Sequence, residues 1–213
     1  MAPRRYRADR RQAAMAETRR RIVEATVALQ AEQGGLATSY AQIAARADVA
    51  VPTVYKHFPT EAALFTACTG HVHVLSPPLG PEIFAGATGV EARVGALVAA
   101  VFACHRFQRP WLRLGVHEAA LIPAVGAIMD SARRELHRLI ALALAPCYGK
   151  APPPALVLLF EILLHFTAWQ RLAEAPQKLS PEAVATAALL ALLGADQEKK
   201  PAKERSRKGK SKP

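Results

Sequence analysis

Side chains that could carry catalysis or bind a metal are present, but none of them forms a complete site. His117-Glu118 starts the pattern of a zinc-protease helix, and the pattern fails because Leu121 stands where the second histidine belongs. His71 and His73 form a possible ligand pair without a third or fourth ligand nearby. No nucleophile–base pair and no glycine-rich phosphate loop is visible. We therefore predict that the protein is not an enzyme and holds no metal or cofactor.

The cysteines and the apolar stretches bear on where the protein works. Cys68, Cys104 and Cys147 are odd in number, far apart and set among apolar residues, which predicts reduced core thiols in a cytosolic protein. Residues 155–169 and 183–193 are the longest apolar stretches, and both are shorter than the roughly 20 residues of a membrane helix. No apolar stretch follows the arginine-rich start, as it would in a secretory signal. We expect a soluble, cytoplasmic protein without a membrane partner.

Positive charge gathers at the two ends of the chain. The formal net charge is +11. Residues 1–21 hold eight arginines against two acidic residues, and residues 196–213 hold eight basic residues against three acidic ones, so the part between them is neutral. Basic arms are typical of nucleic-acid binding, because Arg and Lys displace condensed counterions from phosphates. The C-terminal run could instead serve solubility alone.

The hydrophobic pattern predicts an all-α fold. Apolar residues recur at intervals of three and four almost everywhere, and alternating β-branched runs are missing. A fourth helix is expected to start after Thr60, and residues 76–89, rich in Pro and Gly, mark the boundary between two helical groups. The other helices are predicted at residues 16–32, 40–47, 51–57, 90–107, 110–121, 124–147, 154–173 and 181–193.

The most informative spacing lies between residues 39 and 58. Ser39 and Gln42 have the spacing of a capping box, in which each side chain bonds the other residue's backbone amide. Two short helices then flank a sharp turn at residues 48–50, and Pro52 stands in the first turn of the second helix, where its missing amide costs nothing. This is the pattern of a helix-turn-helix, whose second helix fits a DNA major groove about 12 Å wide.

The same segment resembles the DNA-binding domain of the TetR family. The shared pattern is Ile-Ala, Ala, a turn with Val, three residues, Thr, an apolar residue, Tyr, one residue and His-Phe, with Leu six residues later, within residues 18–65. The resemblance implies base-edge, thymine-methyl or phosphate contacts by Ser39, Tyr40, Val51, Pro52, Thr53, Tyr55, Lys56 and His57. Tyr55 could instead pack against the first helix, and His57 could cap a helix.

Three residues depart from the family pattern. Asp48 stands where Gly is common, although Asp tolerates the left-handed conformation. Ala50 lacks the polar side chain usual at the start of the recognition helix, and Glu61 replaces a Lys that often contacts the DNA backbone. Acidic residues therefore outnumber basic ones in residues 22–70. We hypothesise that the arginine-rich arm, with Arg4, Arg5, Arg7, Arg10 and Arg11, and the helix-start residues Arg19, Arg20 and Arg21 supply the missing contacts.

Residues 114–125 are similar to a segment of many TetR-type sensor domains. The resemblance implies a cavity for a small-molecule effector, apolar or aromatic, and a homodimer formed by the last two long helices. A dimer would present two recognition helices to a pseudo-palindromic operator in double-stranded DNA. The candidate effector-binding residues, which could equally be ordinary core, are Phe102, His105, Trp111, His117, Met129, Phe166 and Trp169.

Together these features predict four segments. Residues 1–15 form a basic flexible arm, 16–75 the helix-turn-helix domain, 76–195 the effector-binding and dimerisation domain, and 196–213 a disordered basic tail. The predicted function is a sequence-specific transcriptional regulator, a repressor released by its effector. The alternative is an architectural protein that coats DNA with little regard to sequence. An operator preference of about a thousandfold over random DNA would separate the two.

Overall fold

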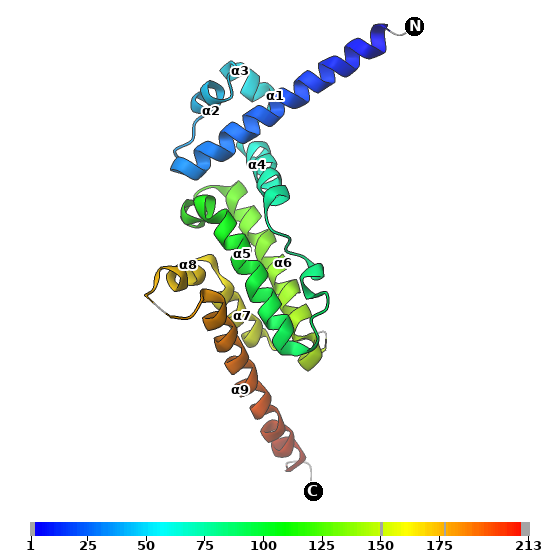
Figure 1. The fold of residues 1–213 in the computed structure, drawn as a ribbon, viewed down its shortest axis with the longest axis vertical. Helices are drawn as coiled ribbons and strands as arrows, with labels where there is room; N and C mark the ends of the chain where they lie inside the picture. The colour runs from blue at the N-terminus through cyan, green and yellow to red at the C-terminus, as the bar shows by residue number, and fades with distance from the viewer. Residues whose placement is uncertain (1–2, 150, 177, 210–213) are drawn as a thin grey trace. The chain divides into compact units, whose positions relative to one another are not determined.

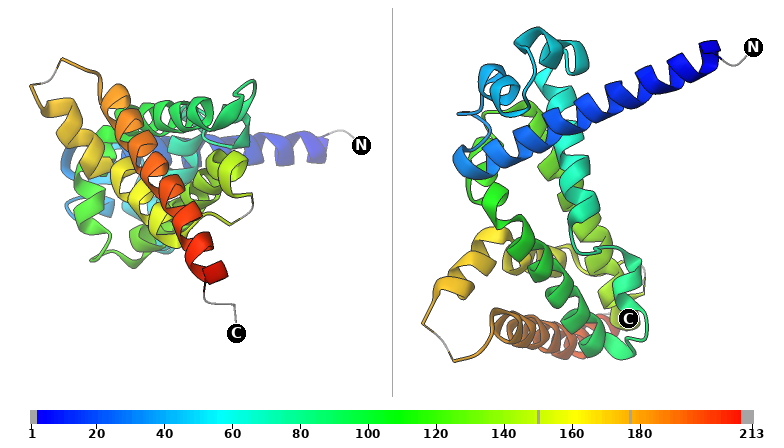
Figure 2. Two further views of the ribbon diagram at one scale, coloured as in Figure 1. Left: turned by 90° about the horizontal axis from the view of Figure 1, so that it is seen from below. Right: turned by 45° about the horizontal axis from the view of Figure 1, so that its top comes forward.

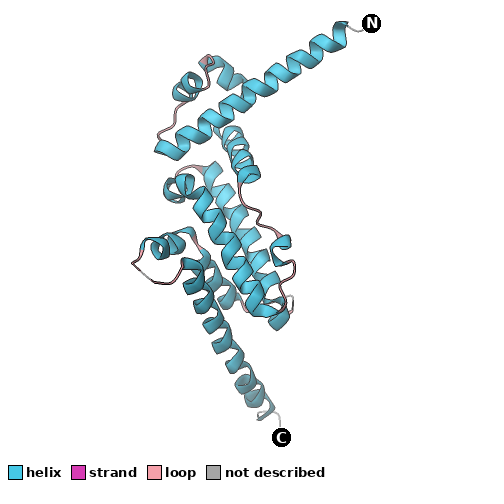
Figure 3. Ribbon diagram, in the orientation of Figure 1, coloured by secondary structure: helices cyan, strands magenta, loops and turns pink. Residues whose placement is uncertain are grey.

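The computed structural model describes residues 3–149, 151–176 and 178–209, and their regular structure is helical throughout (Figures 1 and 3). The fold prediction of an all-α protein is therefore confirmed. In chain order the elements are α1 (Pro3–Gln33), α2 (Tyr40–Arg46), α3 (Val51–His57), α4 (Glu61–Leu75), the short 3-10 helix η1 (Pro81–Phe84), α5 (Gly89–Glu118), α6 (Pro123–Tyr148), α7 (Pro154–Leu164), α8 (Phe166–Glu174) and α9 (Pro181–Gly209).

The chain forms two compact units. The first unit consists of Met1–Ser76 and Phe107–Ser131, and the second of Pro77–Arg106 and Ala132–Pro213. The sequence predicts one boundary near residue 75, whereas here residues 107–131 join the first unit. The reason lies in two polar contacts: the Trp111 indole donates to the Val27 carbonyl oxygen at 2.8 Å, and the Glu118 carboxylate accepts from the Gly35 amide at 2.8 Å.

The core of the first unit is built from α1, α2, α3 and α4, which pack in the pairs α1–α4, α2–α3 and α1–α2. Among the described residues of this unit the buried polar one is Thr26, whose hydroxyl donates to the Ile22 carbonyl oxygen at 2.7 Å. The buried side chains are Ile22, Val23, Ala25, Val27, Leu29, Ile43, Ala44, Ala47, Val54, Phe58, Leu64 and Cys68. Packing in this core stabilises the two short helices α2 and α3, since neither is long enough to be stable alone.

The second unit is built around the N-terminal part of α5, α6, α7, α8 and α9. Helix α7 packs along α9, and α8 contacts both (Figure 2). The sequence predicts one helix over 154–173, but the structure breaks it at His165, whose backbone is extended with φ −66° and ψ 147°. The His165 side chain caps the new helix by accepting from the Thr167 amide at 3.3 Å.

Within the described residues, no single helix is long and apolar enough to cross a membrane. One bent pair, Pro154–Leu164 with Phe166–Glu174, meets the length and composition requirement when the two are taken together, and its helices meet at 48°. One face of this pair, with Leu156, Phe160, Leu164, Phe166 and Trp169, is buried inside the protein.

The outer helices extend further than the sequence predicts. Helix α1 begins at Pro3 instead of near residue 16, and α9 continues to Gly209 instead of ending near residue 193. Helix α5 also runs through Pro110, where the pattern predicts a break. The arms are rich in Ala, Arg, Lys, Glu and Gln, which favour helix without needing a core. Residues 1, 2 and 210–213 of the predicted arm and tail lie outside the described part of the chain.

Candidate nucleic-acid interface

The capping box predicted at Ser39 is present at the start of α2. The Gln42 amide donates to the Ser39 hydroxyl at 3.3 Å, and the Ser39 amide donates to the Gln42 side-chain oxygen at 2.8 Å. At the start of α3, Ala50 makes no side-chain cap and Pro52 lies in the first turn, both as the sequence predicts. The N-terminus of α2 is therefore stabilised by side-chain hydrogen bonds, whereas the stability of α3 depends on the preceding turn and on core packing.

Arg21 of α1 holds the turn between α2 and α3. Asp48 has φ +52°, the only positive φ of a non-glycine residue in the described chain, as its place in the turn predicts. The Arg21 guanidinium donates to the carbonyl oxygens of Ala47, at 3.0 Å from Nε, and of Asp48, at 2.6 Å. These carbonyls follow the last turn of α2 and have no helical partner there. Sequence reasoning missed this role, because Arg21 lies 27 positions before Asp48.

One face of α3 is buried and the other is open to solvent. Val54 and Phe58 lie in the core, whereas Val51, Pro52, Tyr55 and Lys56 are exposed and Thr53 and His57 are half-buried. The Tyr55 side chain is 54% exposed, and its ring contacts Tyr40 of α2 at 4.5 Å between centroids. Tyr40 is itself fixed, since its hydroxyl donates to the Phe58 carbonyl oxygen at 3.2 Å. The helix thus offers a surface with one aromatic side chain already supported.

Arg19, Arg20 and Arg21, which follow the arm, have partners inside the protein. Arg19 lies over the Phe58 ring at 4.8 Å from its centroid, and Arg20 pairs with Glu17 at 2.5 Å and with Glu24 at 2.6 Å. Arg21 is bound to the turn, so all three of these arginines have partners inside the protein. The other residues hypothesised to contact DNA lie in the arm itself. Of those, the structure describes the side chains of Arg10 and Arg11, both exposed; the side chains of Arg4, Arg5 and Arg7 lie outside the described part.

Arg46 of α2 also has a partner inside the protein. Its guanidinium donates to both carboxylate oxygens of Glu32, at 2.6 and 2.7 Å. The pair lowers the pKa of Glu32 through the hydrogen bonds from Arg46. Lys56 makes no hydrogen bond or ion pair with any described residue. Unlike Arg46, it is therefore available to bind a DNA phosphate.

A capped helix, a tight turn and a second helix with an open polar and aromatic face define a helix-turn-helix DNA-binding domain. Residues 22–68 match the family of bacterial regulatory proteins called the tetR family. The predicted resemblance is therefore confirmed, and the chain carries the DNA-binding domain of the TetR family.

Two curated relatives each match this chain over 57 residues. The HTH-type transcriptional repressor KstR of Mycolicibacterium smegmatis is 40% identical over 57 residues, which are 27% of this chain and 28% of that protein. The protein of the same name from Mycobacterium tuberculosis is also 40% identical over 57 residues, 26% of its length. The chain thus matches about a quarter of the length of each of these relatives.

The predicted effector-binding residues divide between the two units. Phe102, His105, Phe166 and Trp169 come together in the second unit, with neighbouring rings between 5.5 and 6.1 Å apart. Trp111, His117 and Met129 belong to the first unit. There the Trp111 indole is bonded to Val27, His117 is exposed and Met129 is half-buried. The predicted set is therefore divided between the two units.

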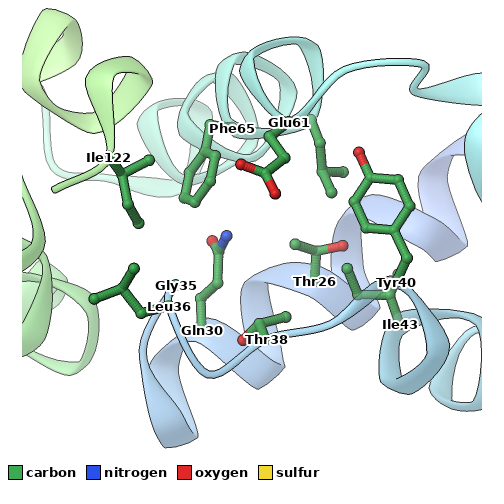
Figure 4. A pocket seen from close by; sticks show the side chains of 11 residues that line it. Thr26, Gln30, Gly35, Leu36, Thr38, Tyr40, Ile43, Glu61, Phe65 and Ile122 are labelled. Carbon is green, nitrogen blue, oxygen red and sulfur yellow. The ribbon is translucent and has the colours of Figure 1, made fainter.

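The first unit also contains a cavity that the sequence does not predict (Figure 4). Its volume is about 110 Å³, and none of the predicted effector-binding residues lines it. Because sites for drug-sized ligands measure about 300–1,000 Å³, this cavity suits a few water molecules. It is lined by Thr26, Gln30, Gly35, Leu36, Thr38, Tyr40, Ile43, Glu61, Leu64, Phe65 and Ile122.

Proposed function

We propose that this protein is a sequence-specific transcriptional regulator that binds a pseudo-palindromic operator as a homodimer. The observation that carries the proposal is the open face of α3, set beside a capped α2 in a domain of the TetR family. In this proposal α3 enters the major groove, where a helix can reach base edges.

Each predicted contact residue has a place in this docking. Thr53 and Tyr55 read base edges, and Val51 and Pro52 contact thymine methyl groups. The contact between the Tyr40 and Tyr55 rings supports this assignment, since it limits the orientations that Tyr55 can adopt before DNA arrives. The phosphate contacts come from Ser39, Tyr40, Lys56 and His57.

Apolar side chains on α7 support the homodimer. Leu158 and Ile162 are 54% and 53% exposed, and Leu159 beside them is 40% exposed. On α9, which packs against α7, the exposed residues Ala183, Ala187 and Ala191 recur every fourth position, so a partner helix could approach closely. An apolar face of this kind next to a small-residue face fits a second copy of the same two helices.

We further propose that the protein is a repressor released by a small-molecule effector, as the sequence predicts. Release requires that the effector bind the conformation with low operator affinity better than the conformation with high operator affinity. The population of the high-affinity conformation then falls. The aromatic group in the second unit is the candidate for this site. We also propose a cytoplasmic location, because the three cysteines are free thiols and two of them are buried.

The test is a selection of genomic DNA fragments by the purified protein at about 0.15 M salt, at which long-range charge attraction is largely screened. A few strongly enriched inverted repeats would support a specific dimeric regulator. Uniform recovery of fragments would instead support the architectural alternative. A Tyr55→Ala protein selected in parallel is the matched control. It lacks a side chain proposed to read bases but keeps the net charge of the wild type.

A further inference from the structure

The indole N–H of Trp169 is buried without a hydrogen-bond acceptor. The residue is 3% exposed, and no acceptor for its Nε1 occurs among the described residues. Such a donor is costly, because it has lost its water without gaining a protein partner. The other tryptophan, Trp111, has the ordinary arrangement, with Val27 as its acceptor. Of the two tryptophans, Trp169 is therefore the one without an acceptor among the described residues, and an acceptor from outside the protein can supply the missing hydrogen bond.

The Trp169 indole belongs to a group of neighbouring aromatic rings. Trp169 and Phe166 of α8 lie 5.5 Å apart between ring centroids, and His105 of α5 lies 5.9 Å from Trp169 and 5.6 Å from Phe166. Phe102, one turn before His105, completes the group at 6.1 Å from the imidazole. These four residues form what we call the aromatic cluster. Its composition favours a flat, apolar molecule, since such rings stack on or against planar surfaces.

His105 adds a polar group but no charge to the aromatic cluster. Its Nε2 lies 2.8 Å from the Leu164 carbonyl oxygen, which can only accept, so Nε2 carries the proton. Burial lowers the pKa of His105 to about 4, although the hydrogen bond to Leu164 opposes the shift. The imidazole is therefore neutral at pH 7, and an anionic ligand would find no compensating cation on these four side chains.

The break between α7 and α8 accounts for this geometry. Helix α7 ends at Leu164, and the extended backbone of His165 denies the Leu164 carbonyl its usual helical partner. His105 supplies the missing donor and so fixes the start of α8 against α5. Phe166 and Trp169, in the first turn after the break, are thereby brought beside His105.

We propose that the aromatic cluster binds a neutral, flat, apolar molecule that carries a carbonyl or ether oxygen, and that this oxygen accepts the hydrogen bond of Trp169 Nε1–H. The effector role of this molecule rests on the proposed function, whereas its chemical class follows from the unpaired donor and the uncharged surroundings. The ligand lies against these rings and satisfies the Trp169 indole N–H, one of two buried side-chain donors in the described part of the chain that have no hydrogen-bond partner; the other is Arg93 Nε.

The test compares three probes of nearly the same shape by calorimetry on the full chain at pH 7: 2-acetylnaphthalene, 2-isopropylnaphthalene and 2-naphthoate. We expect the ketone to bind about tenfold more tightly than the isopropyl compound, the effect of one neutral hydrogen bond, and the carboxylate to bind most weakly. In Trp169→Phe the preference for the ketone should disappear while the isopropyl compound still binds. Trp111→Phe is the matched control and should keep the preference.

Each result decides the proposal. Equal binding of the ketone and the isopropyl compound by the wild type, or binding of none of the three, overturns it without reference to any variant. Persistence of the preference in Trp169→Phe overturns the role of that indole. Operator affinity is measured in the same samples with and without the ketone. A tryptophan-dependent preference that leaves operator affinity unchanged supports the ligand class and refutes effector control; loss of specific DNA binding altogether refutes the regulator and leaves the ligand site standing.

Discussion

The guanidinium of Arg21 donates a hydrogen bond to the carbonyl oxygen of Asp48 at 2.6 Å, and so ties the first helix to the turn of the helix-turn-helix. The contact lies where the chain has Asp in a left-handed conformation, with φ +52°. A family pattern with Gly at this position needs no such support, since Gly adopts positive φ without strain. The arginine therefore compensates for the residue that departs from the pattern.

Arg21→Ala should lower the free energy of unfolding by about 1–2 kcal/mol, because charged hydrogen bonds to two carbonyls are lost at a partly exposed site. Asp48→Gly should recover up to about 1 kcal/mol of that loss, because it removes the conformational strain of the turn. Urea unfolding of both single variants and the double variant measures the two effects. Arg20→Ala is the control and should change little, since its ion pairs are exposed. An Arg21→Ala protein as stable as the wild type would contradict this role.

Glu118→Ala should destabilise the first unit by about 1–3 kcal/mol. The Glu118 carboxylate accepts from the amides of Gly35 at 2.8 Å and Leu36 at 3.1 Å, and both amides would lose a charged acceptor. Gly35→Ala should act on the same contact, because a Cβ there would lie 3.1 Å from a Glu118 oxygen and 3.1 Å from the Phe65 ring. Thermal unfolding measures both, and unchanged midpoints would mean that residues 107–131 are not held to the first unit by this contact.

Tyr55→Ala should reduce operator affinity at least tenfold without unfolding the protein. The side chain is largely solvent-exposed, so its loss removes DNA contacts and little core packing. Fluorescence anisotropy with a labelled operator measures affinity, and circular dichroism monitors the fold. Val74→Ala, an exposed apolar residue of α4, should bind as the wild type does. Wild-type affinity in Tyr55→Ala would refute the placement of α3 in the groove.

Leu158→Glu combined with Ile162→Glu should convert the proposed dimer into a monomer. Two carboxylates would then have to be buried without partners at the α7 face, which costs more than the apolar contact supplies. Sedimentation velocity gives the oligomeric state, and the operator assay should show a parallel loss. Leu179→Glu, at an exposed position between α8 and α9, is the control and should remain dimeric. A double variant that stays dimeric would exclude this face.

Deletion of residues 196–213 should weaken binding to operator and random DNA by about the same factor and should flatten the dependence of log Kd on log salt concentration. These residues carry eight basic side chains against three acidic ones, so their contribution is electrostatic and independent of sequence. Titrations at several salt concentrations measure both quantities. A loss confined to the operator would show instead that the tail reads bases.

Local sequence determined the helix-turn-helix with little ambiguity. The capping box at Ser39, the turn at Asp48 and the proline in the first turn of α3 act within a few residues of one another, and all three are present in the structure. Helical periodicity likewise predicts the all-α fold, because side chains three and four positions apart share one face of a helix. Helix ends were predicted less well, as α1 and α9 show, since good helix formers continue a helix without any packing signal.

The sequence by itself therefore determined the fold class, the DNA-binding motif and the face of α3 that meets solvent, because each depends on contacts between near neighbours in the chain. Only the tertiary structure decided which arginines are already paired, that α7 and α8 separate at His165, and that the Trp111 indole bonds to Val27. Val27 and Trp111 lie 84 positions apart in the sequence. Contacts at such separations depend on how helices pack, and a periodic pattern specifies which face is buried but not what that face touches.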